Sequence, residues 1–287
     1  MKAIYKKELK SYFTNMIGYI FVAFILIITG IFSTMQNFMG RYPSFEIILG
    51  NITFIMMLVV PILTMRVMAE EKNTKTDQLL YSLPVSVSQI IFAKFFAMCT
   101  VLLIPIGVMT LYPLILSLYG TVNFLSAYTG IFGFFLLGAA LIAIGMFMSS
   151  LTESQIISAV ISFGAIFLIY LMRGLASMIP NTAVASYIGF ALLVLVFALI
   201  VYMMTKNYWL AFGIAAVIEL VLSIFYFVKR SMFVGAFPSF MTWLSLFDRL
   251  SNMIEGIFDL TAVIYYLSVI TLFVFFSIQS VEKRRWS

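Results

Sequence analysis

Residues 70–94 read EEKNTKTDQLLYSLPVSVSQIIFAK and separate two long apolar runs. The stretch opens with the acidic residues Glu70 and Glu71, and a third acidic residue, Asp77, precedes a group of leucines. Three leucines then follow the spacing of one helix face: Leu79, Leu80 and Leu83. Pro84 comes next, and a proline disfavours helical backbone at the residue before it. The pattern predicts a short amphipathic helix on a membrane surface, because the flanking apolar runs are long enough to span a bilayer.

The overall composition is typical of a membrane protein. Apolar residues make up 63% of the chain and charged residues 10%, against about 45–50% and 25% in soluble domains. The net charge of +6 comes from basic residues that flank apolar runs, which indicates membrane topology and not nucleic-acid binding. There is no His, and Cys99 is alone, so imidazole catalysis and an internal disulfide are excluded. We expect an all-α, polytopic helical bundle in the lipid bilayer.

The apolar runs predict six to eight transmembrane helices, since a span needs about 20 apolar residues. The candidate spans are residues 17–37, 47–68, 90–118, 126–149, 155–179, 187–204, 207–228 and 261–281. Only Thr205 and Lys206 separate the sixth and seventh runs, so the turn between them must be very tight. These two runs are either full spans or a re-entrant hairpin, and both alternatives return the chain to the side it left.

Residues 1–16 predict an interfacial helix. No small-residue cleavage site follows the first apolar run, which argues against a cleavable signal. On a helix, one side carries Tyr5, Leu9, Tyr12, Phe13 and Met16, and the other carries Lys6, Lys7 and Lys10. Such a helix lies in the headgroup region with its lysines toward anionic lipids. The alternative is a basic flank of the first span without a separate role.

The distribution of Lys and Arg predicts the orientation. An inside N-terminus places twelve basic residues on the cytoplasmic side: Lys2, Lys6, Lys7, Lys10, Arg66, Lys72, Lys75, Lys94, Lys206, Lys283, Arg284 and Arg285. Five remain outside: Arg41, Arg173, Lys229, Arg230 and Arg249. The positive-inside rule therefore predicts that both termini are cytoplasmic.

Two further connections are informative. The inner turn SSLTESQ, residues 149–155, is polar, and Thr152 is placed to cap the next helix. Residues 229–260 form the longest predicted outer segment. Within it, five apolar residues repeat at helical spacing and predict one amphipathic helix over the outer mouth of the bundle: Phe240, Trp243, Leu244, Phe247 and Leu250.

The chain resembles the ABC-2 type permeases, the membrane subunits of a class of ATP-binding-cassette exporters. Their second and third spans are joined by a segment similar to E-x-x-x-G-T-x-x-L-L-x-x-P-V, followed by a Lys in the third span. The matching residues are Glu70, Glu71, Thr76, Leu79, Leu80, Pro84, Val85 and Lys94. Lys75 stands where a glycine is usual, so the backbone turn there is expected to differ. The end of the chain, with Glu255–Gly256, Asp259 and Tyr265–Tyr266, is similar to the family's last outer loop and last span.

This resemblance implies one transmembrane permease domain over residues 1–287, in the plasma membrane, with residues 181–228 as an extra helix pair. The chain has no G-x-x-x-x-G-K-[ST] phosphate loop, so no cofactor is expected on it. ATP and Mg²⁺ are expected in two separate ATPase subunits, and an identical or homologous second permease is expected to complete the path. Residues 69–89 are expected to be a cytoplasmic segment that couples to the ATPase. The residues expected to carry the coupling are Glu70, Glu71, Thr76, Asp77, Leu79, Leu80, Leu83 and Pro84. A second expected contact consists of Ser150, Thr152 and Glu153.

Glu219 supports an alternative function, because it lies midway along the apolar run 207–228. A carboxylate at that depth costs about 2.5–3.5 kcal/mol on insertion scales. It is either a neutral acid that hydrogen-bonds between helices or a proton or substrate site of a proton-coupled secondary transporter. The latter predicts inverted repeats, which this sequence does not show. An intramembrane enzyme is the third class, and a chain without His that has few acids offers almost no catalytic groups for it.

Overall fold

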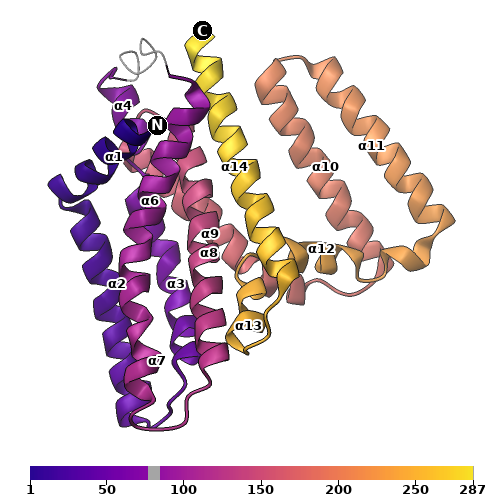
Figure 1. Cartoon of the computed structure of the whole chain (residues 1–287). Helices are drawn as coiled ribbons and strands as arrows, with labels where there is room; N and C mark the ends of the chain where they lie inside the picture. Colours follow the sequence, from indigo (N-terminus) through magenta and orange to yellow (C-terminus); the bar gives the residue numbers. More distant parts are fainter. Residues whose placement is uncertain (77–84, 287) are drawn as a thin grey trace. The chain divides into compact units, whose positions relative to one another are not determined.

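The computed structural model describes residues 1–76 and 85–286, and in this part of the chain all regular structure is helical. The helices of the first half are α1 Lys2–Thr14, α2 Ile17–Ser33, η1 Thr34–Met39, α3 Phe45–Thr64, α4 Ala69–Asn73, α6 Val87–Met109, α7 Leu111–Leu116 and α8 Phe124–Leu151. Those of the second half are α9 Gln155–Met178, α10 Ala183–Thr205, α11 Tyr208–Val228, η2 Arg230–Phe233, α12 Ala236–Leu244, α13 Asp248–Ile254 and α14 Leu260–Trp286. The chain is a polytopic helical membrane protein (Figure 1).

The expected spans all correspond to helices. Among the described residues, seven helices are long and apolar enough to cross a membrane, and α11 is one of them. The sixth expected span is α10, whose apolar stretch is Ala183–Leu199. α10 and α11 have 23 and 21 residues, and the turn between them is as tight as the sequence predicts. Lys206 ends α10 in the left-handed region at φ +54°, and the Asn207 side chain caps α11 by accepting hydrogen bonds from Trp209 N and Leu210 N.

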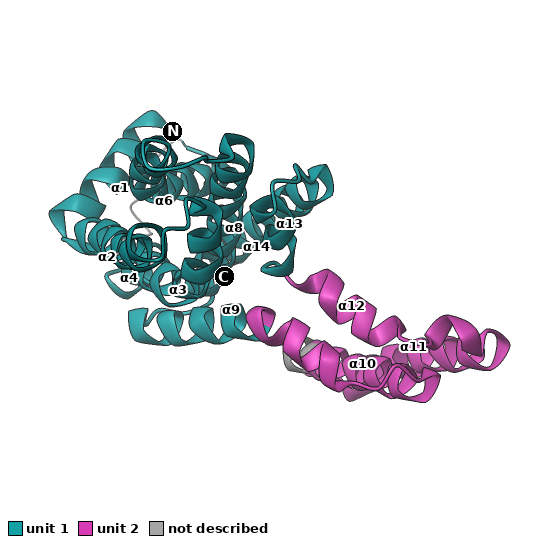
Figure 2. Cartoon of the chain, turned by 90° about the horizontal axis from the view of Figure 1, so that it is seen from below, with its two compact units in different colours: residues 1–168, 246–287 teal, residues 169–245 magenta. Residues whose placement is uncertain are grey.

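The helices form two compact units (Figure 2). Unit 1 comprises residues 1–168 and 246–287, and therefore contains α1 to α4, α6 to α8, most of α9, α13 and α14. Unit 2 comprises residues 169–245 and contains α10, α11, η2 and α12. Within unit 1, α1 and the C-terminal end of α14 lie at the same end of the bundle (Figure 1).

α8 is the central helix of unit 1 and the most buried of the seven candidate spans. It contacts α3, α6, α13 and α14. Its glycines allow this close packing, since a Cβ at Gly138 would lie 2.6 Å from Leu102 Cδ2. Small residues at helix contacts are the usual device in a bilayer, because lipid tails leave little hydrophobic force to drive helices together. The surfaces of α9 and α11 remain largely apolar and exposed, as lipid-facing helices are.

The prediction of a single amphipathic helix in residues 229–260 was wrong. Two short helices, α12 and α13, replace it, and Ser245 between them has extended backbone. The break exposes the Leu246 carbonyl to Tyr266, whose hydroxyl donates a hydrogen bond of 2.8 Å to it. Leu246 and Tyr266 are both fully buried, so this long-range contact outweighs the local helical spacing. α14 then begins at Leu260, directly after Asp259, whose pKa is lowered by hydrogen bonds from Asn252, Thr261 and Ala262.

Replacing Gly145 by Ala is expected to lower the unfolding temperature of the detergent-solubilised protein. A Cβ at this position in α8 would lie 2.9 Å from Thr64 Cβ and 3.0 Å from Thr64 Cγ2 in α3. Overpacking of this kind costs about 1–3 kcal/mol. Gly164→Ala in α9 is the matched control, because a Cβ there meets nothing within 4 Å. Equal unfolding temperatures of the two variants would show that the close contact between α3 and α8 at Gly145 does not limit thermal stability.

Candidate functional site

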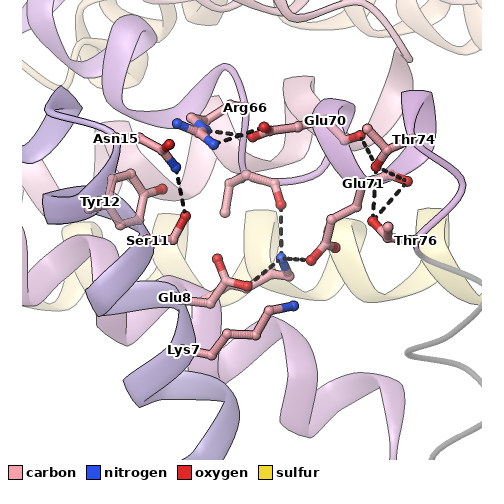
Figure 3. Close-up of a pocket in the computed structure, with 12 residues that line it drawn as sticks. Lys7, Glu8, Ser11, Tyr12, Asn15, Arg66, Glu70, Glu71, Thr74 and Thr76 are labelled. Atoms are coloured by element: carbon pink, nitrogen blue, oxygen red, sulfur yellow. Dashed lines mark hydrogen bonds and ion pairs between the residues drawn. The ribbon is translucent and has the colours of Figure 1, made fainter.

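A buried lysine organises the polar end of unit 1. Lys94 lies in the second turn of α6 and is 1% exposed. Its ammonium group lies 2.8 Å from Glu71 Oε1, 3.2 Å from Glu8 Oε1 and 2.9 Å from the carbonyl oxygen of Val67. An ammonium has three protons to donate, so these three acceptors satisfy it completely. Figure 3 shows the carboxylates of Glu8 and Glu71 converging on this point from two different helices.

The contacts of Lys94 join segments that are far apart in the sequence. Glu8 belongs to α1, Glu71 to α4, and Val67 to the turn between α3 and α4. A charge this deeply buried costs several kcal/mol unless it is paired and hydrogen-bonded. The ammonium therefore requires both carboxylates nearby, and it fixes α1 and α4 against α6.

α1 packs against the bundle along one stripe of its surface. Tyr5 forms a 2.9 Å hydrogen bond with Thr100, Glu8 contacts Lys94, and the Tyr12 hydroxyl donates to the carbonyl of Leu63 at 3.3 Å. Burial raises the pKa of the Tyr12 phenol. The exposed lysines lie on the opposite side, as the amphipathic pattern predicts. That pattern missed Glu8, which is buried beside Tyr12 although it stands among lysines in the sequence.

The spacing Ile4, Glu8, Tyr12 was the available signal for this buried face. Those residues recur every four positions, and they are the buried residues of α1. Ile4 packs against Ile90 and Ala93 of α6. An acid at the centre of such a stripe indicates a basic partner inside the bundle.

Three hydrogen bonds of the Ser149 side chain hold the beginning of α4, and a fourth bond holds its end. Ser149 Oγ in α8 accepts hydrogen bonds from the Met68 and Ala69 amides, each at 3.2 Å, and donates to the Met65 carbonyl at 3.1 Å. Those amides would otherwise be unpaired at the helix N-terminus. Lys72, which is buried, donates from Nζ to the Ser150 carbonyl. α4 is thus tied to α8 as well as to α6.

α4 ends in a Schellman motif. The Thr76 amide donates to the Glu71 carbonyl at 3.0 Å, and the Lys75 amide donates to the Lys72 carbonyl at 3.3 Å. Lys75 has φ +56°, in the left-handed region that glycine favours in this motif. We expected the turn to differ from that of the related permeases because of this lysine. The backbone conformation at Lys75 is one that a glycine adopts without strain, and Lys75 adopts it at a cost.

A polar cavity of about 310 Å³ lies between α1 and α4. Arg66 and Glu70 form one wall and pair through two hydrogen bonds of 2.5 and 2.8 Å. Glu8, Glu71 and Lys94 form its base. Thr74 and Thr76 line the side from which the chain continues to residues 77–84 (Figure 3). Of the expected coupling residues, Glu70, Glu71 and Thr76 are therefore brought together here, while Asp77, Leu79, Leu80, Leu83 and Pro84 lie outside the described residues.

The second group of expected contact residues lies at the end of α8. Ser150 is buried, and its carbonyl accepts hydrogen bonds from Lys72 and from Ser280 of α14. Glu153 is exposed and lies 2.7 Å from Arg284. Thr152 donates to the Ser154 carbonyl, and Ser154 Oγ accepts from the Ile157 amide. The cap of α9 is therefore Ser154, and the prediction that Thr152 caps this helix was wrong.

Glu219 forms a separate polar cluster within unit 2. Its Oε1 accepts a 2.9 Å hydrogen bond from the Tyr187 hydroxyl of α10, which also lies 3.0 Å from Ser223 Oγ. Ser223 Oγ in turn lies 2.8 Å from the Glu219 carbonyl. The arrangement is the hydrogen bond between helices that was one of the two alternatives for Glu219. It is distant in sequence from the Lys94 cluster and shares no residue with it.

The chain matches a known protein family. The family described as "ABC-2 family transporter protein" matches residues 31–228, which is more than half of the chain. The matched range runs from the end of α2 through α11 and so includes the helix pair α10–α11. No curated protein matches the chain.

Lys94→Met is expected to lower the free energy of unfolding by about 3–5 kcal/mol, because it leaves two carboxylates buried without their shared cation. The triple variant Lys94→Met, Glu8→Gln, Glu71→Gln removes those charges and should recover much of the loss. The measurement is thermal or denaturant unfolding in detergent. Lys6→Gln, at an exposed position of α1, is the control and should change stability by less than about 0.5 kcal/mol. Failure of the triple variant to recover stability would contradict charge pairing as the role of Lys94.

Lys75→Gly is expected to raise stability slightly, since a side chain in the left-handed region costs about 1–2 kcal/mol and glycine avoids that cost. Lys75→Val should lower stability, because a β-branched side chain tolerates this region poorly. The two unfolding temperatures are compared with that of Lys75→Ala, which removes the charge and keeps the Cβ. If the alanine and glycine variants unfold together, the backbone strain at position 75 is not significant.

Proposed function

Because this chain belongs to the ABC-2 family of transporter proteins, we propose that it is the membrane-spanning permease subunit of an exporter driven by separate ATPase subunits. Two ATPase copies would each bind ATP and Mg²⁺, and two permease subunits, identical or homologous, would face each other across the translocation path. The chain contributes no phosphate-binding loop. The proposed role of the chain is to change the arrangement of its helices when the ATPase subunits change conformation.

The observation that carries this proposal is the anchoring of α4. Residues 77–84 follow directly from the Schellman motif that ends α4. α4 is bonded to α6 and α1 through the Lys94 cluster, and to α8 through Ser149 and Lys72. A force on residues 77–84 would therefore displace several helices together. Packed interfaces of this type change between discrete arrangements and do not deform gradually, which suits a two-state transport cycle.

The proposed contact with the ATPase combines an apolar and a charged component. Leu79, Leu80 and Leu83 are spaced to fill a groove, as amphipathic helices do in many complexes. Glu70 and Glu71 are paired within the permease, so their proposed role is to position the base of the segment. Thr76 is exposed beside the cavity and is the last described residue before the segment. Glu153 is the exposed member of the second proposed contact.

We propose that the protein lies in the plasma membrane, with α1, α4 and both termini on the cytoplasmic side. This sidedness would place twelve of the Lys and Arg residues on the cytoplasmic side and five on the other, as the positive-inside rule favours. In unit 1, α1, α4 and the C-terminal end of α14 share one end of the bundle (Figure 1). A cytoplasmic ATPase would then meet the segment that follows α4.

Site-specific crosslinking tests the docking role. A Thr76→Cys variant is made in a Cys99→Ala background, where the native thiol, which is buried, is removed. A short bifunctional crosslinker is expected to join this cysteine to the co-purifying ATPase subunit. Thr121→Cys is the control, because Thr121 is also exposed but follows α7, on the opposite side of one span. Crosslinking from Thr121 and not from Thr76 would overturn the proposed orientation.

Loss of binding provides the complementary arm of the same test. Replacing Leu79, Leu80 and Leu83 together by Asp is expected to abolish co-purification of the ATPase, while the unfolding temperature of the permease stays unchanged. Retained binding would contradict the docking role. Transport by the permease alone in proteoliposomes with an imposed proton gradient would instead favour the secondary transporter based on Glu219.

A further inference from the structure

A second cavity, of about 440 Å³, lies in unit 1 at the end of the bundle remote from α4. Its walls are the connection between α2 and α3 and the connection between α7 and α8. Asn37, Phe38 and Arg41 line the first wall, and Tyr119 and Thr121 line the second. The volume falls within the range of about 300–1,000 Å³ that is usual for small-ligand sites.

The first wall has an ordered and strained backbone. α2 continues into the π-helix η1, and π-helical turns are rare and frequently occur at functional sites. Asn37 is 5% exposed, and its amide nitrogen donates to the Tyr42 and Ser44 carbonyls at 2.6 and 3.2 Å. These bonds fold the chain back over η1. Arg41 lies within that loop at φ +57°, in the left-handed region.

The second wall is fixed by contacts with the first. The Phe38 and Tyr119 rings meet edge to face with centroids 5.9 Å apart. Gly120 lies so close to Pro43 that a Cβ would stand 3.2 Å from Pro43 Cβ. The cavity is therefore formed by two loops that support each other.

The charge of the cavity selects an anion. Arg41 is the one charged residue among the described residues that line it. In the part of the chain that the structure describes, no carboxylate forms an ion pair with Arg41. A guanidinium offers five donors in a planar fork that matches phosphate oxygens, and the hydroxyl of Thr121 offers another.

The position of the cavity identifies the class of anion. It lies where the apolar spans Ile17–Met39 and Val87–Leu116 end. The end of a span is expected at the level of the lipid headgroups, because the length of a span matches the hydrocarbon core. Tyr42 and Tyr119 are 66% and 76% exposed beside it, as aromatic residues of the membrane interface are. Phe38, which lines the cavity, presents exposed apolar surface, and so do Met35 and Ile115, which are close to the lining residues in sequence; acyl chains can lie along such surface. A small soluble anion would gain no binding energy from that apolar surface.

We propose that this cavity binds the phosphate group of an anionic phospholipid, with the Arg41 guanidinium as its principal ligand and the Thr121 hydroxyl as a second donor. The bound lipid would fill the space between the two connections and hold the outer ends of α2, α3 and α7 together. The site does not depend on the ATPase contact proposed above.

The test uses the full chain in detergent, with phosphatidylglycerol and phosphatidylcholine as probes and native mass spectrometry as the readout. The wild-type protein should retain phosphatidylglycerol in preference to phosphatidylcholine. Arg41→Gln should weaken phosphatidylglycerol binding about tenfold, corresponding to 1.4 kcal/mol. Arg41→Lys should bind with intermediate affinity, because it keeps the charge and loses the planar fork. Arg230→Gln is the control, since the Arg230 guanidinium packs over Tyr226 in unit 2.

Three outcomes would overturn the proposal. These are equal lipid binding by the Arg41→Gln and wild-type proteins, equal retention of the two lipids by the wild-type protein, and displacement of phosphatidylglycerol by millimolar inorganic phosphate. The last would identify a site for free anions. Arg41→Asn guards against misfolding, because asparagine tolerates a positive φ. It should weaken lipid binding as Arg41→Gln does, with an unchanged unfolding temperature.

Discussion

The pairing of one buried ammonium group with two carboxylates determines how the polar end of unit 1 is assembled. Lys94 is inaccessible to water, so its charge must be balanced by groups that the protein supplies. Glu8 and Glu71 do so from α1 and from α4. Neither of these helices is long enough to be stable by itself, and helix formation without tertiary contacts is unfavourable at such lengths. Their position therefore depends on this charge pairing and on the contacts that surround it.

The remaining contacts of α4 make it a rigid connection between the bundle and the segment that follows. Ser149 pairs with its first amides, Lys72 bonds to the end of α8, and the Schellman motif closes its last turn. These bonds either join α4 to the end of α8 or complete its own backbone pairing. Under the proposed function, a connection of this kind would transmit displacement from the ATPase without losing it in local bending. At the opposite end of unit 1, the Asn37 side chain donates hydrogen bonds to the Tyr42 and Ser44 carbonyls and so fixes the loop that carries Arg41.

Much of the fold could be predicted from residue patterns, and the candidate site only in part. Apolar length identified each long helix, and the two-residue turn at Thr205 and Lys206 was evident from spacing alone. The acidic residues Glu70 and Glu71 were recognised as important, but their partners within the chain, Arg66 and Lys94, were not. Glu8 was missed because an acid among lysines fits a solvated helix face. The break at Ser245 was missed because helical periodicity continues through it, while a distant tyrosine, Tyr266, decides the backbone there.

The sequence by itself determined that this is a helical membrane protein and approximately where each helix lies, because the length of an apolar run is a local property set by the thickness of the bilayer. The family also followed from local motifs and their order. Only the tertiary structure decided which charges meet, since Glu8 and Lys94 are 86 positions apart and no local pattern relates them. It also decided that Lys75 takes a glycine-like conformation, because hydrogen bonds at the end of α4 outweigh the preference of the residue itself.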